Sequence, residues 1–546
     1  MHSFLPAEPD RLVIHFDQEY CSGKCLHQGL CGDRPSINLR TRVFLLVIVT
    51  ALLATSMNGE STAAGLYQYG VWQTNDKILA SSFVDGVVVY VGWSALEPTQ
   101  DAVDVSFIKA VRTRAKELGK KLIIRIVSAE LTPPWVYRLG IPRVLDTTDH
   151  DPRWVPLYWH PKYLGVLDEF IGKISAQLDG DPVIEAVQVG IGRYGEMCLE
   201  GFDWLNHDFS PKLWTATCIS ILDIYKKHFR KTPLLVMIMS ADLPGGRWTS
   251  PMQEVASYAA ANGIGIQFNG LSPDNSYLWG LRGQPDEDSA VGIFRKYAGK
   301  VPLAFELTND KVDARLSCMN AVSEHASFLF VHTSLLADPE LRGIFAFTHY
   351  FLGRSLRSSD AVWTLLRQTN PDSVEETGKK NYEFGLKQIE FPTDTKFVVD
   401  KQQISVTTKT MPLDDFLGLP CRRTVDSDQQ AYLAFQIDGE VNLGSKPTLS
   451  VIFADVGMDS WSLFYMTQDG LRKFGTVHKQ DTRQWLIVDF ELPGLSTGHV
   501  ADILIDSNGD GDEYIHYLQL NRAGMAAPLP ISLPHISYSP SARRPE

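Results

Sequence analysis

The stretch Val187–Met197 (VQVGIGRYGEM) joins an apolar, β-type run to a glycine-rich turn that ends in a carboxylate, Glu196. A second stretch, Val301–Leu307 (VPLAFEL), places Glu306 at the end of another apolar run. In an α/β barrel the functional side chains project from the C-terminal ends of the strands, so glutamates that follow two different strands can meet in one pocket. The two stretches therefore predict a parallel α/β fold with paired carboxylates at one end.

The sequence around these stretches continues the same pattern. From Gly65 to Gln368, short β-rich apolar runs alternate with longer amphipathic segments, which is typical of βα units on a parallel sheet. The clearest helical segments are Val105–Leu118, which Gly119 ends, and Tyr163–Leu178. This pattern predicts a (β/α)8 TIM barrel over residues 63–370. The candidate strands are Leu66–Val71, Val87–Trp93, Lys121–Val127, Val183–Gly190, Leu234–Met239, Ile264–Asn269, Pro302–Leu307 and Ile344–His349.

The composition changes beyond Asn370, where Gly, Asp and Pro turns separate short alternating runs. Such a pattern predicts an all-β, jelly-roll-like sandwich over residues 380–525. The segment 526–546 is rich in Pro, Ser and Arg, and we expect it to be disordered. The candidate strands of the sandwich include Ala431–Ile437, Thr448–Phe453, Trp461–Tyr465, Gln484–Phe490 and Ile515–Leu520.

The N-terminal part of the chain has the sequence pattern of a targeting region. An apolar run, Val43–Ala54, follows two arginines and precedes small polar residues, which is typical of a secretory signal over residues 43–62. The run is shorter than the roughly 20 apolar residues of a membrane-spanning helix, so we expect a secreted protein, with a short membrane anchor as the alternative. We expect the arm of residues 1–42 to be disordered. Its cysteines, Cys21, Cys25 and Cys31, match no common zinc spacing.

The charge balance excludes some classes of partner. The 546 residues include 51 Lys and Arg against 64 Asp and Glu, a net charge of −13, and no dense basic run occurs. Nucleic acid and anionic membrane surfaces are therefore not expected as partners, apart from the N-terminal anchor if it is retained. Four scattered cysteines remain after residue 62, too few for a disulfide framework, although one bridge can form.

Three motifs in the first half of the predicted barrel resemble clan A glycoside hydrolases, and most closely the family 42 β-galactosidases. They are Gly92–Pro98 (GWSALEP), Lys116–Ile126 (KELGKKLIIRI) and Thr132–Val136 (TPPWV). The resemblance implies a (β/α)8 barrel that hydrolyses O-glycosidic bonds, with carbohydrate as the partner. It also implies an acid/base glutamate after the fourth strand and a nucleophile at the end of the seventh, which correspond here to Glu196 and Glu306.

The sequence departs from the clan in front of the acid/base residue. The clan usually has Asn there, to hold the 2-hydroxyl of the sugar, and this chain has Gly195. The Gly-x-Gly-x-x-Gly-Glu turn that ends at Glu196 also resembles the acid-bearing loop of β-amylases, which are inverting enzymes. Retaining pairs of carboxyl groups stand about 5–5.5 Å apart and inverting pairs about 6.5–9.5 Å. We expect a retaining enzyme, and the inverting alternative stays open.

Other residues near predicted strand ends are candidates for binding the sugar. A buried, aromatic-lined site would raise the pKa of Glu196, and Tyr194 and Trp204 are placed to line it. Arg125 lies within a strand and can pair with a catalytic carboxylate, whereas Glu130 is expected to be a solvated loop acid. For each candidate, a purely structural role is the alternative. The predicted substrate-binding residues are Trp93, Arg125, Trp135, Tyr194, Gln267, Asn269 and His349.

One motif in the C-terminal module has the composition of a cation site. Asp506, Asn508 and Asp510 reproduce the opening of a calcium loop, Asp-x-Asn-x-Asp-Gly, but its closing position is Tyr517 instead of Glu. The alternatives are an acidic turn between strands and a structural calcium ion. For catalysis we expect no metal or organic cofactor, because two carboxylates and water suffice for glycoside hydrolysis.

The sequence thus predicts an exported glycosidase that cleaves β-linked oligo- or polysaccharides. The alternative is a non-catalytic carbohydrate-binding or cell-surface protein that retains the barrel. The glycine at position 195 favours this alternative, and the presence of both glutamates disfavours it.

Overall fold

The computed structural model describes residues 63–70, 75–238, 242–273, 290–308, 310–367, 381–391, 393, 395–399, 402–425 and 430–537. All described residues belong to one compact unit, Ser61–Glu546. The predictions for the arm 1–42 and for the signal segment 43–62 therefore lie outside the described residues. In the described parts of the chain, no helix is both long and apolar enough to cross a membrane.

The first domain is a closed barrel of parallel strands, which confirms the predicted fold. The strands follow one another around the barrel in the order β1, β2, β3, β6, β7, β10, β11 and β12, and β12 pairs with β1 to close it. The structure thus places the turn of Glu196 after the fourth barrel strand and Glu306 on the seventh. The strands are β1 (Gly65–Tyr69), β2 (Gly86–Gly92), β3 (Lys121–Val127), β6 (Ile184–Val189), β7 (Leu234–Met237), β10 (Gly265–Leu271), β11 (Leu303–Leu307) and β12 (Phe328–His332).

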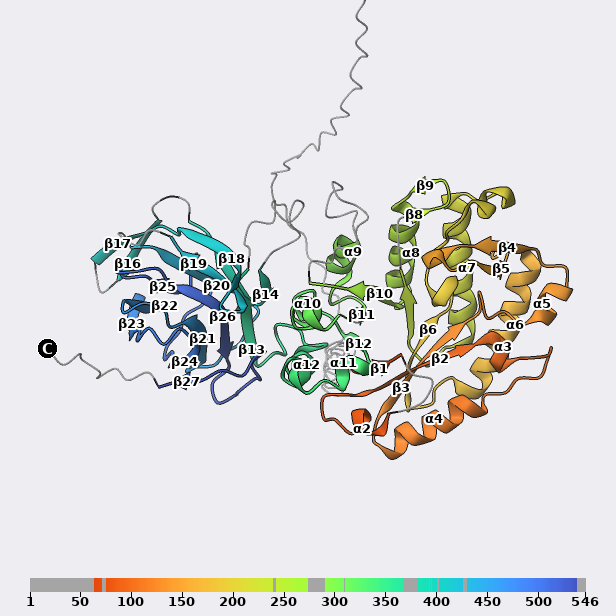
Figure 1. The fold of residues 1–546 in the computed structure, drawn as a ribbon, viewed down its shortest axis with the longest axis horizontal. Helices are drawn as coiled ribbons and strands as arrows, with labels where there is room; N and C mark the ends of the chain where they lie inside the picture. Colours follow the sequence, from red (N-terminus) through yellow and green to blue (C-terminus); the bar gives the residue numbers. More distant parts are fainter. Residues whose placement is uncertain are drawn as a thin grey trace, which may run out of the picture. The chain divides into compact units, whose positions relative to one another are not determined.

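Helices connect the strands and lie around the barrel (Figure 1). The helix predicted at Val105–Leu118 is α4, and Gly119 beyond it has a φ of 68°, the left-handed conformation that commonly ends a helix. Two hairpins, β4–β5 and β8–β9, lengthen the loops that follow β3 and β7. The helices are α2 (Asp76–Leu79), α3 (Trp93–Leu96), α4 (Ser106–Glu117), α5 (Pro134–Arg138), α6 (Pro161–Leu178), α7 (Pro211–His228), α8 (Ser250–Ala261), α9 (Ala290–Tyr297), α10 (Lys311–Ser323), α11 (Thr333–Leu336) and α12 (Arg342–Phe351). The hairpin strands are β4 (Arg143–Asp146), β5 (Arg153–Pro156), β8 (Asp242–Leu243) and β9 (Gly246–Arg247).

The inside of the barrel changes from apolar to polar along the strands. A buried cluster that includes Ile123, Ala304 and Phe328 fills the part of the barrel nearer the N-terminal ends of the strands. Because side chains alternate along a strand, the residues two positions further on face the same way, and these include Arg125 and Glu306. The polar layer therefore lies toward the C-terminal ends of the strands, where barrel enzymes carry their sites.

The eighth strand is not where the sequence predicted it. Residues Ile344–His349 belong to helix α12, and the eighth strand is β12. Both segments are short apolar runs, which hydrophobic periodicity cannot assign to helix or strand. Helix α12 buries one apolar face, on which Phe347 packs against Trp363 and Tyr517, with ring centroids 5.4 and 6.5 Å apart.

The second domain is a sandwich of two mainly antiparallel sheets, as predicted. One sheet has the order β14, β13, β26, β21, β24 and β27, with β18 and β19 attached through β26, and the other has the order β15, β20, β25, β22, β23, β16 and β17. Buried side chains of both sheets, such as Val451 and Leu463, share one core. The strands are β13 (Ala361–Leu365), β14 (Tyr382–Phe384), β15 (Leu386–Ile389), β16 (Thr395–Val399), β17 (Gln402–Val406), β18 (Thr410–Phe416), β19 (Leu419–Thr424), β20 (Tyr432–Ile437), β21 (Thr448–Ala454), β22 (Ser460–Thr467), β23 (Gly470–His478), β24 (Trp485–Glu491), β25 (Ile503–Asp506), β26 (Tyr514–Asn521) and β27 (His535–Ile536).

Both ends of the sandwich differ from the predicted boundaries of 380 and 525. Strand β13 lies within the range 63–370 that the sequence analysis gave to the barrel, yet it pairs with β14 and β26. At the other end, β27 pairs with β24, so part of the segment expected to be disordered completes a sheet. Such short edge strands carry too few residues for a periodic signal.

Candidate active site

Glu306 projects into the polar end of the barrel and binds an arginine from the opposite wall. Arg125 Nη2 on β3 lies 2.6 Å from Glu306 Oε2 on β11, although the two strands are not neighbours in the sheet. The contact therefore crosses the inside of the barrel. The Arg125 side chain is 2% exposed and that of Glu306 is 17% exposed. A guanidinium so placed stabilises the negative charge of the carboxylate.

A belt of hydrogen bonds holds Arg125 in place. Its Nε donates to Gln188 Oε1 at 2.5 Å, and Gln188 Nε2 donates to Gln267 Oε1 at 2.6 Å. Gln267 Nε2 then donates to Asn269 Oδ1 at 2.7 Å. These residues lie on β3, β6 and β10, so the belt spans several strands. Because each amide uses its oxygen as an acceptor and its nitrogen as a donor, the order of bonds fixes the orientation of all the side chains.

The belt ends at the second glutamate. Asn269 Nδ2 donates to Glu196 Oε1. Burial and, after it, the charge of Glu306 raise the pKa of Glu196 to about 7, while the Asn269 hydrogen bond and the charge of Arg125 oppose the shift. Glu196 is therefore a carboxyl group that can hold or release a proton near neutral pH.

The residue in front of Glu196 has a left-handed backbone. Gly195 has a φ of 86°, in the left-handed region that glycine adopts without strain. A Cβ atom there would also lie 2.8 Å from Met237 Cε. The amide next to Glu196 is supplied instead by Asn269 from a neighbouring part of the barrel.

The two glutamates thus differ in their surroundings. Glu196 has a raised pKa and a hydrogen-bond donor, whereas Glu306 is paired with a buried guanidinium. Two carboxyl groups in such different environments are suited to act as acid and as nucleophile or base.

Replacing Arg125 by Met is expected to destabilise the protein by about 3 kcal/mol, because it leaves a buried network without its central donor. A matched control is Arg112→Met, which removes a pair of bonds to Asp181 from a side chain that is 29% exposed. That change should cost about 1 kcal/mol or less. Urea unfolding of both variants measures the difference, and equal losses would contradict a buried structural role for Arg125.

Glu130 and Trp204 both bind other groups of the chain. The Tyr194 backbone N–H donates to Glu130 at 3.1 Å, so Glu130, 12% exposed, is not the solvated loop acid that the sequence suggested. Burial raises the pKa of Glu130. Trp204, expected beside Glu196, is fully buried, stacks on Tyr158 and donates to Asp146 Oδ2 at 3.0 Å.

Trp93 and Trp135 are not brought to the site. Both are buried, at 0% and 5% exposure, and their indole N–H groups donate to Glu97 at 3.0 Å. Trp93 also stacks on Phe170 of α6, with ring centroids 4.6 Å apart. Glu97, itself buried, accepts a further bond from Lys173 at 2.8 Å. The motif at residues 92–98 therefore fixes α3 and α5 against α6 and does not present an indole to a sugar.

Replacing Trp93 by Phe should therefore lower stability and leave substrate affinity unchanged. Loss of the bond to Glu97 and of part of the ring is expected to cost about 1–3 kcal/mol. Thermal unfolding and the KM of the folded variant measure the two effects separately. A large rise in KM at unchanged stability would restore Trp93 as a sugar-binding residue.

His349 lies at the other end of the barrel from the glutamates. Its Nε2 is 3.2 Å from Oδ1 of Asp85, the residue that precedes β2. The prediction of a substrate contact followed from the wrong assignment of the eighth strand. Strand β12 ends instead at His332, whose ring packs edge-on against Tyr69, 5.5 Å away.

Three side chains of the polar layer, Tyr69, Tyr90 and Gln188, were not predicted from the sequence. Tyr90 OH accepts from Arg125 Nη1 at 3.0 Å, and Tyr69 OH donates to the carbonyl of Leu307 at 3.1 Å. The charge of Glu306 contributes to the raised pKa of both tyrosines, although burial is the larger cause. On their own strands, all three occupy positions that face the inside of the barrel, as Arg125 and Glu306 do. The alternation of side chains along a strand could therefore have predicted them.

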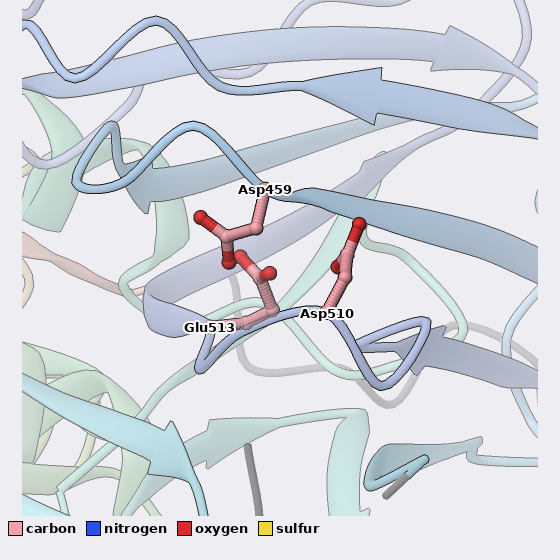
Figure 2. Close-up of side chains that lie close together, drawn as sticks. All are labelled: Asp459, Asp510 and Glu513. Carbon is pink, nitrogen blue, oxygen red and sulfur yellow. The ribbon is translucent and has the colours of Figure 1, made fainter. Parts of the chain in front are cut away.

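The predicted calcium residues Asn508 and Asp510 accept hydrogen bonds within the chain. Asn508 Oδ1 accepts from Ser462 Oγ at 2.7 Å, and Asp510 accepts from Ser460 Oγ at 2.9 Å. Asp510 also lies near Asp459 and Glu513, as Figure 2 shows. The ammonium of Lys479 lies 2.8 Å from Asp459 and 3.0 Å from Glu513, so a buried cation of the chain already neutralises part of this cluster. A structural calcium ion stays a prediction.

Neither a protein-family model nor a curated protein matches the sequence. Among solved structures, the chain is similar to a β-galactosidase from the psychrophilic Marinomonas ef1, with 13% identity over 49% of this chain and 53% of that chain and a TM-score of 0.35. It is also similar to a cold-adapted β-galactosidase from Rahnella sp. R3, with 14% identity over 50% of each chain and a TM-score of 0.33. A third match is the catalytic domain of a β-amylase from Paenibacillus polymyxa, with 10% identity over 49% of this chain and 91% of that chain and a TM-score of 0.37. The match spans about half the length of the two β-galactosidases.

Proposed function

We propose that the protein is a glycoside hydrolase in which Glu196 is the general acid/base and Glu306 the nucleophile. The observation that carries the proposal is the pair of unlike carboxyl groups at the polar end of one barrel. Glu196 has a pKa of about 7, and Glu306 is paired with Arg125 at 2.6 Å. Glycoside hydrolysis needs one carboxyl group that gives up a proton and one that carries a negative charge.

In the first step, protonated Glu196 donates its proton to the glycosidic oxygen while Glu306 attacks the anomeric carbon, so the bond to the leaving sugar breaks and an ester to Glu306 forms. In the second step, ionised Glu196 takes a proton from water, whose oxygen attacks the same carbon and releases Glu306. Arg125 binds and positions the carboxylate of Glu306, and Asn269 orients Glu196.

The substrate is proposed to be a β-linked oligo- or polysaccharide, as the sequence motifs imply. Exposed aromatic side chains on the loops after β3 and β7, Trp154 at 55% and Trp248 at 43%, offer flat apolar faces to sugar rings. The apolar run at residues 43–54 supports a proposal of export.

The direct test incubates the protein with aryl β- and α-glycosides and with plant and algal polysaccharides, and follows the anomeric protons of the product by NMR. Release of sugar with the anomeric configuration of the substrate supports the two-step mechanism. Inverted product would reassign Glu306 from nucleophile to base. No turnover on the panel, combined with measurable polysaccharide binding, would favour the non-catalytic alternative to which the glycine at position 195 points.

A further inference from the structure

The turn that carries Glu196 has a backbone conformation that its own sequence does not favour. Tyr194 and Gly195 have φ values of 57° and 86°, so two consecutive residues are left-handed. For a residue with a side chain, such as Tyr194, this conformation costs roughly 1 kcal/mol or more. Hydrogen bonds inside the turn, such as Gly192 N–H to Glu196 O at 2.8 Å, define its shape. Contacts from outside must hold the Tyr194 conformation.

Two side chains bind the backbone of Tyr194, one at each of its polar groups. Both carboxylate oxygens of Glu130 accept from the Tyr194 N–H, at 3.1 and 3.4 Å. On the other side, Tyr90 OH donates to the Tyr194 carbonyl at 2.8 Å. Glu130 follows β3 and Tyr90 belongs to β2, so the turn after β6 is tied to two other strands of the barrel.

The residue directly before Tyr194 strengthens this attachment. Arg193 is 1% exposed, and its guanidinium donates to Tyr194 OH at 2.9 Å and lies 4.7 Å from the centre of that ring. It also lies 3.8 Å from a Glu130 oxygen and donates to the Asp151 carbonyl at 2.9 Å. The Tyr194 side chain is thereby fixed together with its backbone.

Tyr90 also links the turn to the other glutamate. Its hydroxyl accepts from Arg125 Nη1 at 3.0 Å, and Arg125 Nη2 binds Glu306 at 2.6 Å. A continuous series of contacts thus runs from Glu306 through Arg125 and Tyr90 to the Tyr194 carbonyl, two residues before Glu196. Any movement of the turn changes the position of one glutamate relative to the other.

We propose that Tyr90 and Glu130 are positioning residues, which hold the turn of Tyr194 and so set the place of Glu196 opposite Glu306. Neither acts on the substrate bond itself. The catalytic part of this inference rests on the proposed glycosidase function, and the structural part does not. Displacement of a catalytic group by about 1 Å lowers turnover much more than it lowers affinity.

The structural part is tested by hydrogen exchange and mass spectrometry of the full chain. Tyr90→Phe and Glu130→Ala should each accelerate exchange of the amides at 191–197 by about tenfold or more, because each removes a buried hydrogen bond. Glu130→Gln retains an acceptor oxygen and should exchange nearly as the unaltered protein does. The matched control is Tyr163→Phe, which removes a buried hydroxyl 3.4 Å from Ser128 Oγ and should leave the turn unchanged. Unaltered exchange in both Tyr90→Phe and Glu130→Ala would overturn the proposal.

The catalytic part is tested on a substrate that the unaltered protein cleaves. Tyr90→Phe and Glu130→Ala should lower kcat about 10- to 100-fold while KM changes less than about threefold, and Glu130→Gln should restore most of kcat. A change confined to KM, or full kcat despite rapid exchange, would overturn the positioning role. If the variants exchange faster as expected but the unaltered protein cleaves no glycoside, the structural role of Tyr90 and Glu130 is supported and the proposed glycosidase function is contradicted.

Discussion

Glu306→Gln is expected to abolish turnover, with kcat lower by about 10⁴-fold or more, while substrate binding persists. Glutamine has the shape of glutamate, and its amide oxygen can still accept from Arg125 Nη2, so the fold should survive. It lacks the negative charge that attacks the anomeric carbon. Steady-state kinetics and calorimetric titration with an uncleaved oligosaccharide separate the lost chemistry from the retained binding.

Glu324→Gln is the matched control for this substitution. Glu324 is also a buried glutamate paired with an arginine, since Arg295 Nη2 lies 3.1 Å from its Oε1, but it caps α10 away from the polar end of the barrel. The control variant should retain full kcat. Full turnover in Glu306→Gln would contradict the role of Glu306 as nucleophile. If the unaltered protein shows no turnover and both proteins bind the oligosaccharide equally, the non-catalytic alternative is favoured.

Most of the barrel could be predicted because its strands are apolar runs between clear helix signals. The failure at the eighth strand concerns α12, whose buried residues recur at helical spacing: Ile344, Phe345, Phe347, Thr348 and Phe351. The predicted strand took in only Ile344–His349, a window too short to separate helical from strand periodicity. The helical signal extends over the whole of Arg342–Phe351.

The candidate site was predictable in part for the same reason. Glu306, Arg125 and Gln267 lie on strands whose register could be counted, so their inward direction followed from the alternation of side chains. Trp93 and Trp135 were predicted to bind the sugar, but indoles near strand ends pack in hydrophobic cores as readily as they line sugar sites. The role of Glu130 depends on a contact with Tyr194, 64 residues away in sequence, which no local pattern contains.

The pH dependence of turnover should report the proton on Glu196. The group must be protonated to act as an acid, and its pKa is about 7, so kcat/KM should fall as the pH rises through about 7. Asn269→Ala removes a hydrogen bond that lowers this pKa, and the alkaline limb should therefore move to higher pH. A limb that stays in place in this variant would contradict the assignment of the titrating group to Glu196.

Glu196→Gln should lower turnover by an amount that depends on the leaving group. Glutamine cannot donate the proton, so glycosides of alcohols should lose about 10²- to 10⁴-fold, whereas dinitrophenyl glycosides, whose leaving group departs without a proton, should lose far less in the first step. The alkaline limb near pH 7 should disappear with the titrating group. Glu185→Gln, at the other end of β6 and 3.3 Å from Lys121, provides the control and should keep both the rate and the limb. Equal losses for all leaving groups would mean that Glu196 holds the substrate or the fold and does not transfer the proton.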